Sequence, residues 1–273
     1  MKQYKMVISD FDGTLFRSDY TVSEKSKDII QQFVENGGIF VISTGRSPQA
    51  ILPIARELGL TGVVACFNGA MIVDIQTGKP VFERSHTVQD TVDICKLTEE
   101  LGVYAIVLDR EQYYAKEHNK YLDYYKKATL IDAVLSNKPL SEFVQENSIE
   151  SVKVNCIVEK EKREMLLTEI DARTEGRFYI TSGSRHLVEI SPKGFNKGTT
   201  VTFLADYYNV PIESIIAVGD SLNDLPMLKT AGLGLAVKNA EPTLKNEVKV
   251  YPYTNDENAV ARIIEQYALK EIL

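Results

Sequence analysis

The segment Val7-Ile8-Ser9-Asp10-Phe11-Asp12-Gly13-Thr14-Leu15 decides how this sequence folds. It begins with a short apolar run that is typical of a buried strand, and two carboxylates then follow in a turn that contains glycine. In open α/β sheets, ligands bind at the edge where the parallel strands end. On a regular strand, Asp10 and Asp12 would point to opposite faces. A turn that begins at Phe11, with Gly13 to permit the bend, brings both carboxylates towards one site. A purely structural interpretation, with Asp12 as the cap of an acidic turn, is the alternative.

Short apolar runs alternate with amphipathic helical patterns in the first and last thirds of the chain. This alternation predicts a Rossmann-like α/β core, in which one parallel sheet carries helices on both faces. The expected strands span residues 6–9, 39–43, 63–67, 215–218 and 233–237. The expected helices include one that Ser23 caps and Gly37-Gly38 stops, and two more over residues 49–58 and 199–208.

The middle third of the chain has a different pattern, which predicts an inserted α+β cap domain over residues 84–188. The catalytic core is then discontinuous and comprises residues 1–83 and 189–273. Within the insertion we expect helices over residues 87–101 and 160–174, and strands over 104–108, 113–116, 152–158, 178–181 and 187–190.

Composition limits the possible partners. With 44% hydrophobic and 25% charged residues and a formal net charge of -7, the chain resembles an ordinary globular protein. Binding to nucleic acid or to anionic membranes needs clustered lysine and arginine, so neither partner is expected. The three cysteines stand singly, which favours buried free thiols, and the N-terminus lacks a signal-peptide pattern. These features favour a cytoplasmic location and leave the oligomeric state open.

A second strand, Phe40-Val41-Ile42-Ser43, ends in Thr44-Gly45-Arg46 just before a helix start marked by Ser47-Pro48. A hydroxyl and free backbone N–H groups at such a place form a cradle for an anion. Thr44 could equally be a helix cap with no ligand. Arg46 could touch a substrate or pair with an acidic surface residue.

Two later segments complete the set of polar groups. Lys197 precedes a helix. Another predicted strand leads into an acidic turn in the segment Ile216-Ala217-Val218-Gly219-Asp220-Ser221-Leu222-Asn223-Asp224. Mg²⁺ prefers six oxygen ligands and keeps several waters. Asp220, Asp10 and the main-chain carbonyl of Asp12 would suffice with a phosphate oxygen. Lys197 could stabilise phosphate oxygens and keep the nucleophile ionised, or it could be a solvated lysine at a helix start.

Together the four segments resemble the motifs of the haloacid dehalogenase (HAD) superfamily, which run Asp-x-Asp-Gly-Thr, strand-Ser/Thr, Lys and Gly-Asp-x-x-Asn-Asp. The form Ser43-Thr44-Gly45-Arg46, the Asn68-Gly69-Ala70 that follows, and the long insertion before Lys197 are similar to the Cof-type phosphatase branch with an α/β cap. The resemblance covers essentially the whole chain. It implies a phosphoric monoester hydrolase that depends on Mg²⁺.

The resemblance also implies roles for individual residues. Asp10 would be the nucleophile and a metal ligand, and Asp12 the general acid and base that offers its carbonyl to the metal. The remaining roles are a metal ligand at Asp220, phosphate contacts from the Phe11 amide, Thr44, the Gly45 amide and Asn223, charge neutralisation by Lys197, and orientation or direct metal contact by Asp224.

The expected function is hydrolysis of a small phosphorylated metabolite, such as a sugar phosphate, through an aspartyl-phosphate. A phosphomutase-type phosphotransferase is the nearest alternative, and a non-catalytic phosphate sensor is a third. The three histidines are isolated, so packing roles are expected for them, although Arg185-His186 could face the substrate. The sequence does not identify which cap residues bind the substrate.

Overall fold

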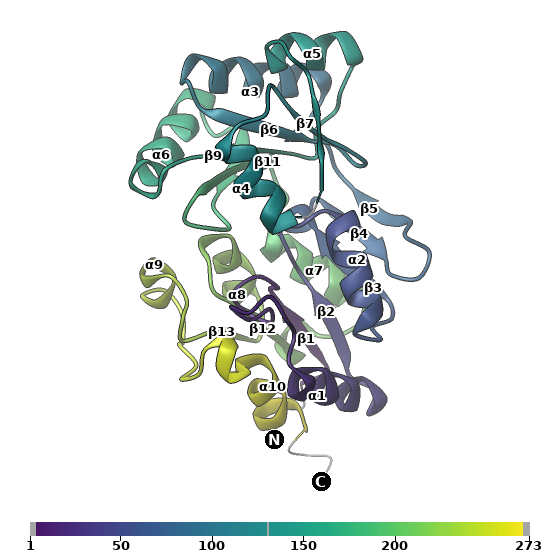
Figure 1. Cartoon of the computed structure of the whole chain (residues 1–273). Helices are drawn as coiled ribbons and strands as arrows, with labels where there is room; N and C mark the ends of the chain where they lie inside the picture. The colour runs from purple at the N-terminus through teal and green to yellow at the C-terminus, as the bar shows by residue number, and fades with distance from the viewer. Residues whose placement is uncertain (1–3, 130, 270–273) are drawn as a thin grey trace. The chain divides into compact units, whose positions relative to one another are not determined.

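The computed structural model describes residues 4–129 and 131–269, which divide into two compact units (Figure 1). The first unit comprises the described residues of Met1–Gly45, Leu52–Val81 and Asn196–Leu273. The second comprises Arg46–Ile51 and Phe82–Phe195.

The first unit is built on a four-stranded parallel sheet with the order β13-β12-β1-β2. Its strands are β1 (Met6–Ser9), β2 (Ile39–Ile42), β12 (Ile215–Gly219) and β13 (Leu233–Ala236). All four residues of β1 are buried, as expected for a central strand that is covered on both faces. The α/β prediction for the core is confirmed.

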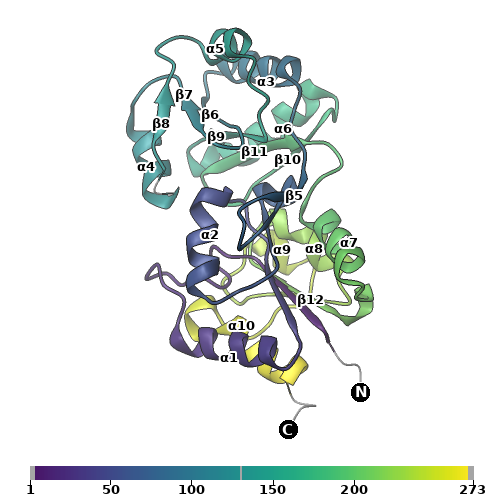
Figure 2. The same cartoon turned by 90° about the vertical axis from the view of Figure 1, so that its right-hand side faces the viewer.

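Helices cover this sheet in two groups, which Figure 2 shows as α1 beside α10 and α7 beside α8. The chain moves from β1 to β2 in one direction and from β12 to β13 in the other, so right-handed connections place α1 and α8 on opposite faces. Ser23 caps α1, as predicted, by accepting a hydrogen bond from the Ser26 amide. The helices of this unit are α1 (Glu24–Glu35), α7 (Lys197–Tyr208), α8 (Leu225–Thr230), α9 (Pro242–Lys245) and α10 (Ala259–Ile264), with short turns η1 (Phe67–Gly69), η3 (Ile212–Ser214), η4 (Leu222–Asp224), η5 (Asn255–Glu257) and η6 (Glu265–Leu269).

The predicted strand at residues 63–67 does not belong to the parallel ladder. It forms β3 (Val63–Cys66), which pairs antiparallel with β4 (Met71–Asp74) in a three-stranded sheet completed by β5 (Pro80–Glu83). Just one parallel bridge, between Ser43 and Ala65, links β3 to the end of β2. The sequence pattern missed this because an apolar run does not reveal which neighbour it pairs with.

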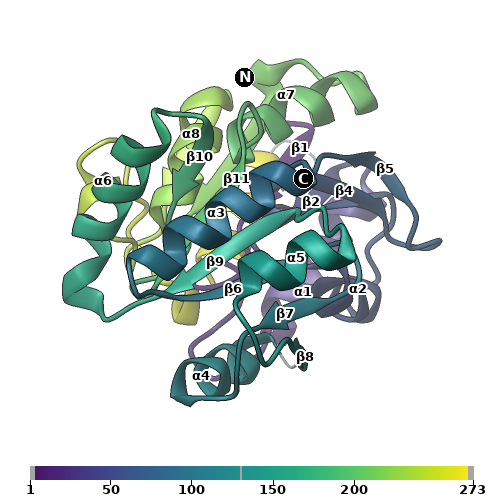
Figure 3. The ribbon, with the colours of Figure 1, turned by 90° about the horizontal axis from the view of Figure 1, so that it is seen from above.

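The second unit contains a six-stranded sheet with the order β10-β11-β9-β6-β7-β8. Figure 3 looks down on α3, α5 and α6, and a continuous apolar cluster joins residues of these helices to one face of the sheet. The strands are β6 (Tyr104–Leu108), β7 (Tyr113–Ala115), β8 (Ala133–Leu135), β9 (Lys153–Ile157), β10 (Phe178–Thr181) and β11 (Leu187–Pro192); the helices are α3 (Val88–Glu100), α4 (Lys120–Thr129), α5 (Leu140–Asn147), α6 (Arg163–Thr174) and the short η2 (Lys160–Lys162), and α2 (Pro48–Glu57) begins in this unit.

The predicted boundary between residues 188 and 189 falls inside β11. Glu189 and Ile190 on that strand pair with β9 and β10 within the second unit, and the chain leaves this unit after Phe195. At the other boundary, the second unit resumes at Phe82, close to the predicted residue 84. The change of sequence pattern at both places gives only approximate domain boundaries.

Candidate active site

The turn after β1 presents Asp10 at the end of the parallel sheet. The register pairs Ser9 with Val218 on one side and with Ile42 on the other, so the residues that follow three strands emerge at one edge. Asp10 is nearly buried, and its amide donates to the carbonyl of Val218 at 2.8 Å. The carbonyl of Phe11 then accepts from the amides of the next turn, which fixes the bend.

Gly13 allows this turn to approach closely the acidic loop that follows β12, residues 220–224. Its φ of +77° lies in the left-handed region, and a Cβ added there would stand 2.6 Å from Oδ2 of Asp220. The hydroxyl of Thr14 donates to the other oxygen, Oδ1, of Asp220 at 3.0 Å. The turn therefore both admits and orients this carboxylate.

Lys197 joins two carboxylates at the centre of the site. Its Nζ lies 2.5 Å from Oδ1 of Asp10 and 2.6 Å from Oδ1 of Asp224. The side chain is 0% exposed, so the solvated alternative for this lysine is wrong. Lys197 is the first residue of α7. The side chain of Asn196, just before it, accepts hydrogen bonds from the amides of Gly198 and Thr199 and so fixes where the helix begins.

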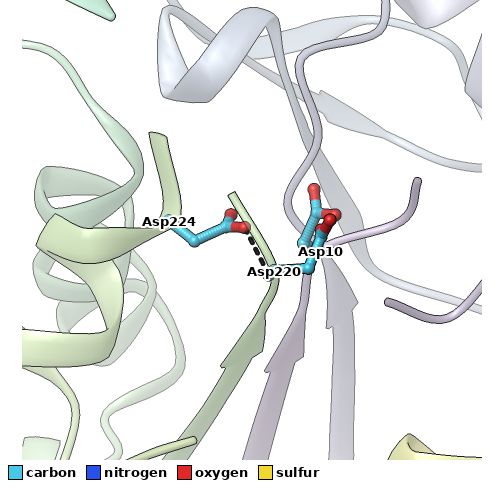
Figure 4. Close-up of side chains that lie close together, drawn as sticks. All are labelled: Asp10, Asp220 and Asp224. Atoms are coloured by element: carbon cyan, nitrogen blue, oxygen red, sulfur yellow. Dashed lines mark hydrogen bonds between the residues drawn. The ribbon is translucent and has the colours of Figure 1, made fainter. Parts of the chain in front are cut away.

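Asp224 holds the acidic loop after β12 in shape. Its Oδ2 accepts from the amides of Asp220 and Ser221, both at 2.9 Å, and the first of these bonds is drawn in Figure 4. Its other oxygen receives Lys197. Figure 4 shows the carboxylates of Asp10 and Asp220 next to each other, with Asp224 reaching towards them from the far side of the loop.

The segment after β2 places further polar groups in the same unit. Thr44 is buried, and its amide donates to Ala65 while its carbonyl accepts from the amide of Asn68. The side chain of Asn68 accepts a hydrogen bond from Asn223 at 3.0 Å. Asn68 has a φ of 59°, a left-handed conformation that asparagine tolerates better than most residues. This contact ties the loop after β3 to the acidic loop.

The cluster brings three carboxyl groups together with one ammonium group. Carboxylate oxygens of Asp10, Asp220 and Asp224 lie within 4.8 Å of one another, and Lys197 supplies one positive charge among them. Burial raises the pKa of Asp10 well above its usual range, with Lys197 opposing and the two other aspartates adding to the effect. Burial and the charge of Asp224 raise the pKa of Asp220 to about 7. Three clustered carboxyl groups fit a divalent cation, which prefers oxygen ligands and favours the ionised forms.

Comparison with known proteins gives the family. The profile of the haloacid dehalogenase-like hydrolases matches residues 7–264. The chain belongs to this family. The predicted resemblance to its Cof-type phosphatases is confirmed, and the protein is a phosphatase of the HAD type.

Similar proteins align along nearly the whole HAD chain. A 5-amino-6-(5-phospho-D-ribitylamino)uracil phosphatase of Bacillus subtilis is 32% identical over 277 residues, covering 96% of this chain and 97% of the relative. A haloacid dehalogenase-like hydrolase structure from B. subtilis is 28% identical, with a TM-score of 0.78 and coverage of 96% of this chain and 99% of that one. A haloacid dehalogenase-like hydrolase from Bacteroides thetaiotaomicron, 24% identical over 97% of this chain and 99% of its own, shares the fold with a TM-score of 0.82.

HAD hydrolases generally use a divalent metal ion, and among the described residues the three aspartates are the acidic group arranged to hold one. Of the other predicted site residues, Phe11 is fully buried and Asp12 exposes its side chain at the turn. Arg46 is half-buried and starts the short segment that groups with the second unit.

Sequence reasoning gave no role to Thr14 or Asn68, although both lie within motifs that it quoted. Their hydroxyl and amide contacts depend on loops that meet only in the fold. The histidines lie in the second unit, where His86 is buried against Phe178, His118 pairs with Asp123, and the ring of His186 lies beside Tyr124. Across the described residues, no helix combines the length and apolar character needed to cross a bilayer.

Proposed function

We propose that this phosphatase hydrolyses a small phosphomonoester, with Mg²⁺, through an aspartyl-phosphate on Asp10. The observation that carries the proposal is the buried contact of Lys197 with both Asp10 and Asp224. A lysine held within hydrogen-bonding distance of a buried carboxylate favours the ionised form that a nucleophile requires.

In the first step, an Oδ of Asp10 attacks phosphorus in line with the ester oxygen. The P–O bond to the leaving group breaks, and Asp12 gives that oxygen its proton. In the second step, Asp12 takes a proton from water, which attacks the aspartyl-phosphate and releases inorganic phosphate and free Asp10. The exposure of Asp12 at the turn supports this role, because the group must reach both a leaving group and water.

Several groups would hold the phosphate during these steps. The Lys197 ammonium would neutralise oxygens of the transferred group. Thr44, with the amides of Gly45 and Phe11, would bind the remaining oxygens, and Asn223 would contact them from the acidic loop. Arg46 would approach the substrate from the start of its segment.

Asp10, Asp220 and the main-chain carbonyl of Asp12 would hold the magnesium ion, with Asp224 orienting this set through the bonds to the loop amides. When bound, the cation supplies positive charge that lets the anionic phosphate approach a cluster of carboxylates. The grouping of three aspartates, with ligand oxygens within 4.8 Å of one another, supports this assignment.

The proposed substrate is a phosphorylated polyol, sugar or similar metabolite that the protein meets in the cytoplasm. Three B. subtilis relatives, 32%, 27% and 29% identical, carry the name 5-amino-6-(5-phospho-D-ribitylamino)uracil phosphatase, which supports including that compound in a substrate panel. The net charge of -7 supports a small-molecule partner rather than nucleic acid or a membrane.

The decisive measurement is phosphate release from such a panel with Mg²⁺ and with EDTA, for the wild type and for Asp10→Asn. Turnover should depend on Mg²⁺ and fall by about a thousandfold or more in the variant. Asp28→Asn, on the exposed side of α1, is the matched control and should keep full activity. Turnover that persists in Asp10→Asn would contradict the covalent role.

Water labelled with ¹⁸O shows which atom of the proposed intermediate the water attacks. Over many turnovers the label should enter phosphate. Under a single turnover, the position of the label shows which atom the water attacked. If water attacks the aspartyl carbon, Asp10 gains the label; if it attacks phosphorus of the intermediate, released phosphate gains it. Trapping the phosphorylated protein on rapid acid quench checks the intermediate itself, and its absence would exclude the covalent step.

A further inference from the structure

The loop after β13, residues 237–241, contacts two parts of the candidate active site within the first unit. The side-chain nitrogen of Asn239 donates to the main-chain carbonyl of Gly13 at 2.7 Å. Two residues further along, the amide of Glu241 donates to the main-chain carbonyl of Asp220 at 2.8 Å. This loop, which we call the β13 loop, therefore holds both the turn after β1 and the start of the acidic loop.

Main-chain bonds fix the β13 loop itself. The amide of Val237 donates to the carbonyl of Gly219 at 3.1 Å, at the end of β12. The amide of Lys238 donates to the carbonyl of Tyr253 at 2.9 Å, and Ala240 is buried. Because Cα atoms two residues apart are separated by at most about 7 Å, a loop fixed in this way holds its two bonding partners at a set spacing.

The two partners of the Asn239 side chain determine which way its amide points. Its oxygen accepts a hydrogen bond from the main-chain amide of Asn255 at 3.0 Å, and a main-chain amide can only donate. The carbonyl of Gly13 can only accept, so the reversed side chain would lose both bonds. This position therefore needs a group that both donates and accepts.

Asn255 is a second anchor for the turn after β1. Its side-chain nitrogen donates to the main-chain carbonyl of Phe16 at 2.9 Å, and the residue is nearly buried. Phe16 also closes the turn from within, since its amide donates to the carbonyl of Phe11 at 2.8 Å. The two asparagines thus hold the turn at two carbonyls, and Asp12 is the neighbour of the first, Gly13.

These bonds act where the proposed metal site requires accuracy. Two of its proposed ligands are the carbonyl of Asp12, in the turn, and the carboxylate of Asp220, in the acidic loop. Mg²⁺ requires nearly octahedral oxygen ligands at about 2.0–2.1 Å, whereas Ca²⁺ accepts flexible arrangements at about 2.3–2.6 Å. The β13 loop bonds Asp220 itself and the residue after Asp12, so it sets the spacing between these two ligands.

We infer that Asn239 is a positioning residue that makes the aspartate cluster selective for a small divalent cation. This inference rests on the proposed phosphatase function with Mg²⁺. Gly13 has no side chain to restrict its backbone, so the hydrogen bond from Asn239 supplies the restraint. With the carbonyl of Gly13 held, the carbonyl of Asp12 keeps its direction towards the cation. Asn255 restrains the far end of the turn in the same way.

The test measures cation binding by titration calorimetry on the whole chain, first stripped with EDTA, with MgCl₂ and CaCl₂ as the titrants. Asn239→Ala should weaken Mg²⁺ binding by about tenfold, the lower end of the range for residues that orient metal ligands, and Ca²⁺ binding by less than about threefold. The Mg²⁺ concentration for half-maximal phosphate release should rise by the same factor. Asn255→Ala should act in the same direction but more weakly, because Phe16 is further than Gly13 from Asp12 along the chain.

Asn36→Ala is the matched control for stability. Asn36 is also an exposed asparagine of the first unit, and its side-chain nitrogen donates to the main-chain carbonyl of Gln32 at 2.8 Å. Both variants lose side-chain hydrogen bonds at the surface, so Tm measured in EDTA should fall slightly and similarly in the two. Asn36→Ala should keep wild-type binding of both cations.

The outcomes distinguish the inference from the proposed function. Unchanged Mg²⁺ affinity in Asn239→Ala would overturn the inference and leave the phosphatase proposal intact. Equal losses of affinity for Mg²⁺ and Ca²⁺ would also overturn it, because the side chain would then support the whole site without selecting a cation. A wild type that binds no Mg²⁺ would instead remove the proposed metal assignment, and the inference with it.

Discussion

Among the residues that the structure describes, two lysines are buried with carboxylates, one in each unit, and their surroundings differ. Lys197 lies at the start of α7 and contacts Asp10 and Asp224, which themselves follow two parallel strands. Lys153 lies on β9 and contacts Glu189 on the adjacent antiparallel strand. Both ammonium groups are essentially inaccessible to water.

The difference lies in what the neighbouring polar atoms do. Around Lys197, Asp224 uses both oxygens, and Asp220 receives hydrogen bonds from Thr14 and Ser221. Around Lys153, Asn155 and Ser191 keep atoms without partners among the described residues. Asn223, next to Asp224, also keeps its Oδ1 without a partner among the described residues. The clearer difference is that several hydrogen bonds fix the carboxylates around Lys197, as a reaction centre requires.

Of the changes to either lysine, replacing Lys197 by methionine should have the larger effect on turnover. The side chain keeps its approximate size but loses its charge, so kcat should fall by about a hundredfold to a thousandfold. Phosphate release under saturating Mg²⁺ measures this. Lys229→Met, in an exposed pair with Glu247, is the control and should keep wild-type turnover. Near-normal turnover in Lys197→Met would remove the lysine from the proposed chemistry.

Lys153→Met sharpens the comparison through stability. It leaves Glu189 buried without its lysine, which should cost about 3–5 kcal/mol in the free energy of unfolding. Urea unfolding measures the loss. The double variant Lys153→Met/Glu189→Leu should recover most of it, because both charges are then gone. No recovery would mean that each side chain stabilises the sheet independently of the other.

Acid should weaken folding through His86 in the second unit. Burial lowers its pKa from 6.5 to about 4. The neutral imidazole therefore contributes its full stability above pH 6.5, and the contribution is lost as the pH falls towards 4. Linkage gives about 3 kcal/mol between pH 7.5 and pH 4. Urea unfolding across this range should show a shallower decline in His86→Phe than in the wild type; parallel curves would contradict the assignment.

Gly13→Ala tests how closely the turn and the acidic loop must approach. Alanine at a φ of +77° should cost about 1–2 kcal/mol in stability, and its Cβ would displace Asp220. Gly37→Ala shares the positive φ, +83°, but meets no atom within 4 Å. Both variants should therefore lose similar stability from the backbone, while Gly13→Ala alone should lose activity. Equal activities would show that the displacement does not matter.

Much of the first unit was predictable because its elements are local. Apolar runs ending in Asp10, Thr44 and Asp220 predicted the strands, and the parallel arrangement brings strand ends to one edge. The pairing of β3 with β4 was missed, because a buried apolar run has no preferred partner in the sequence. In the second unit, residues 120–129 and 140–147 were not assigned as the helices α4 and α5.

The sequence alone determined the order of the chemistry-bearing residues, their strand and helix context, and the resemblance to HAD phosphatases, because these depend on neighbours along the chain. The tertiary structure decided which distant groups share a buried environment. Lys197 and Asp224 become neighbours of Asp10, and Glu189 becomes the partner of Lys153, only when strands and helices assemble. Polar alternation in Lys153-Val154-Asn155-Cys156 was visible, but whether its polar face met water or protein was not. Burial and pairing are properties of the packed sheet, and they decide how strongly each charge acts.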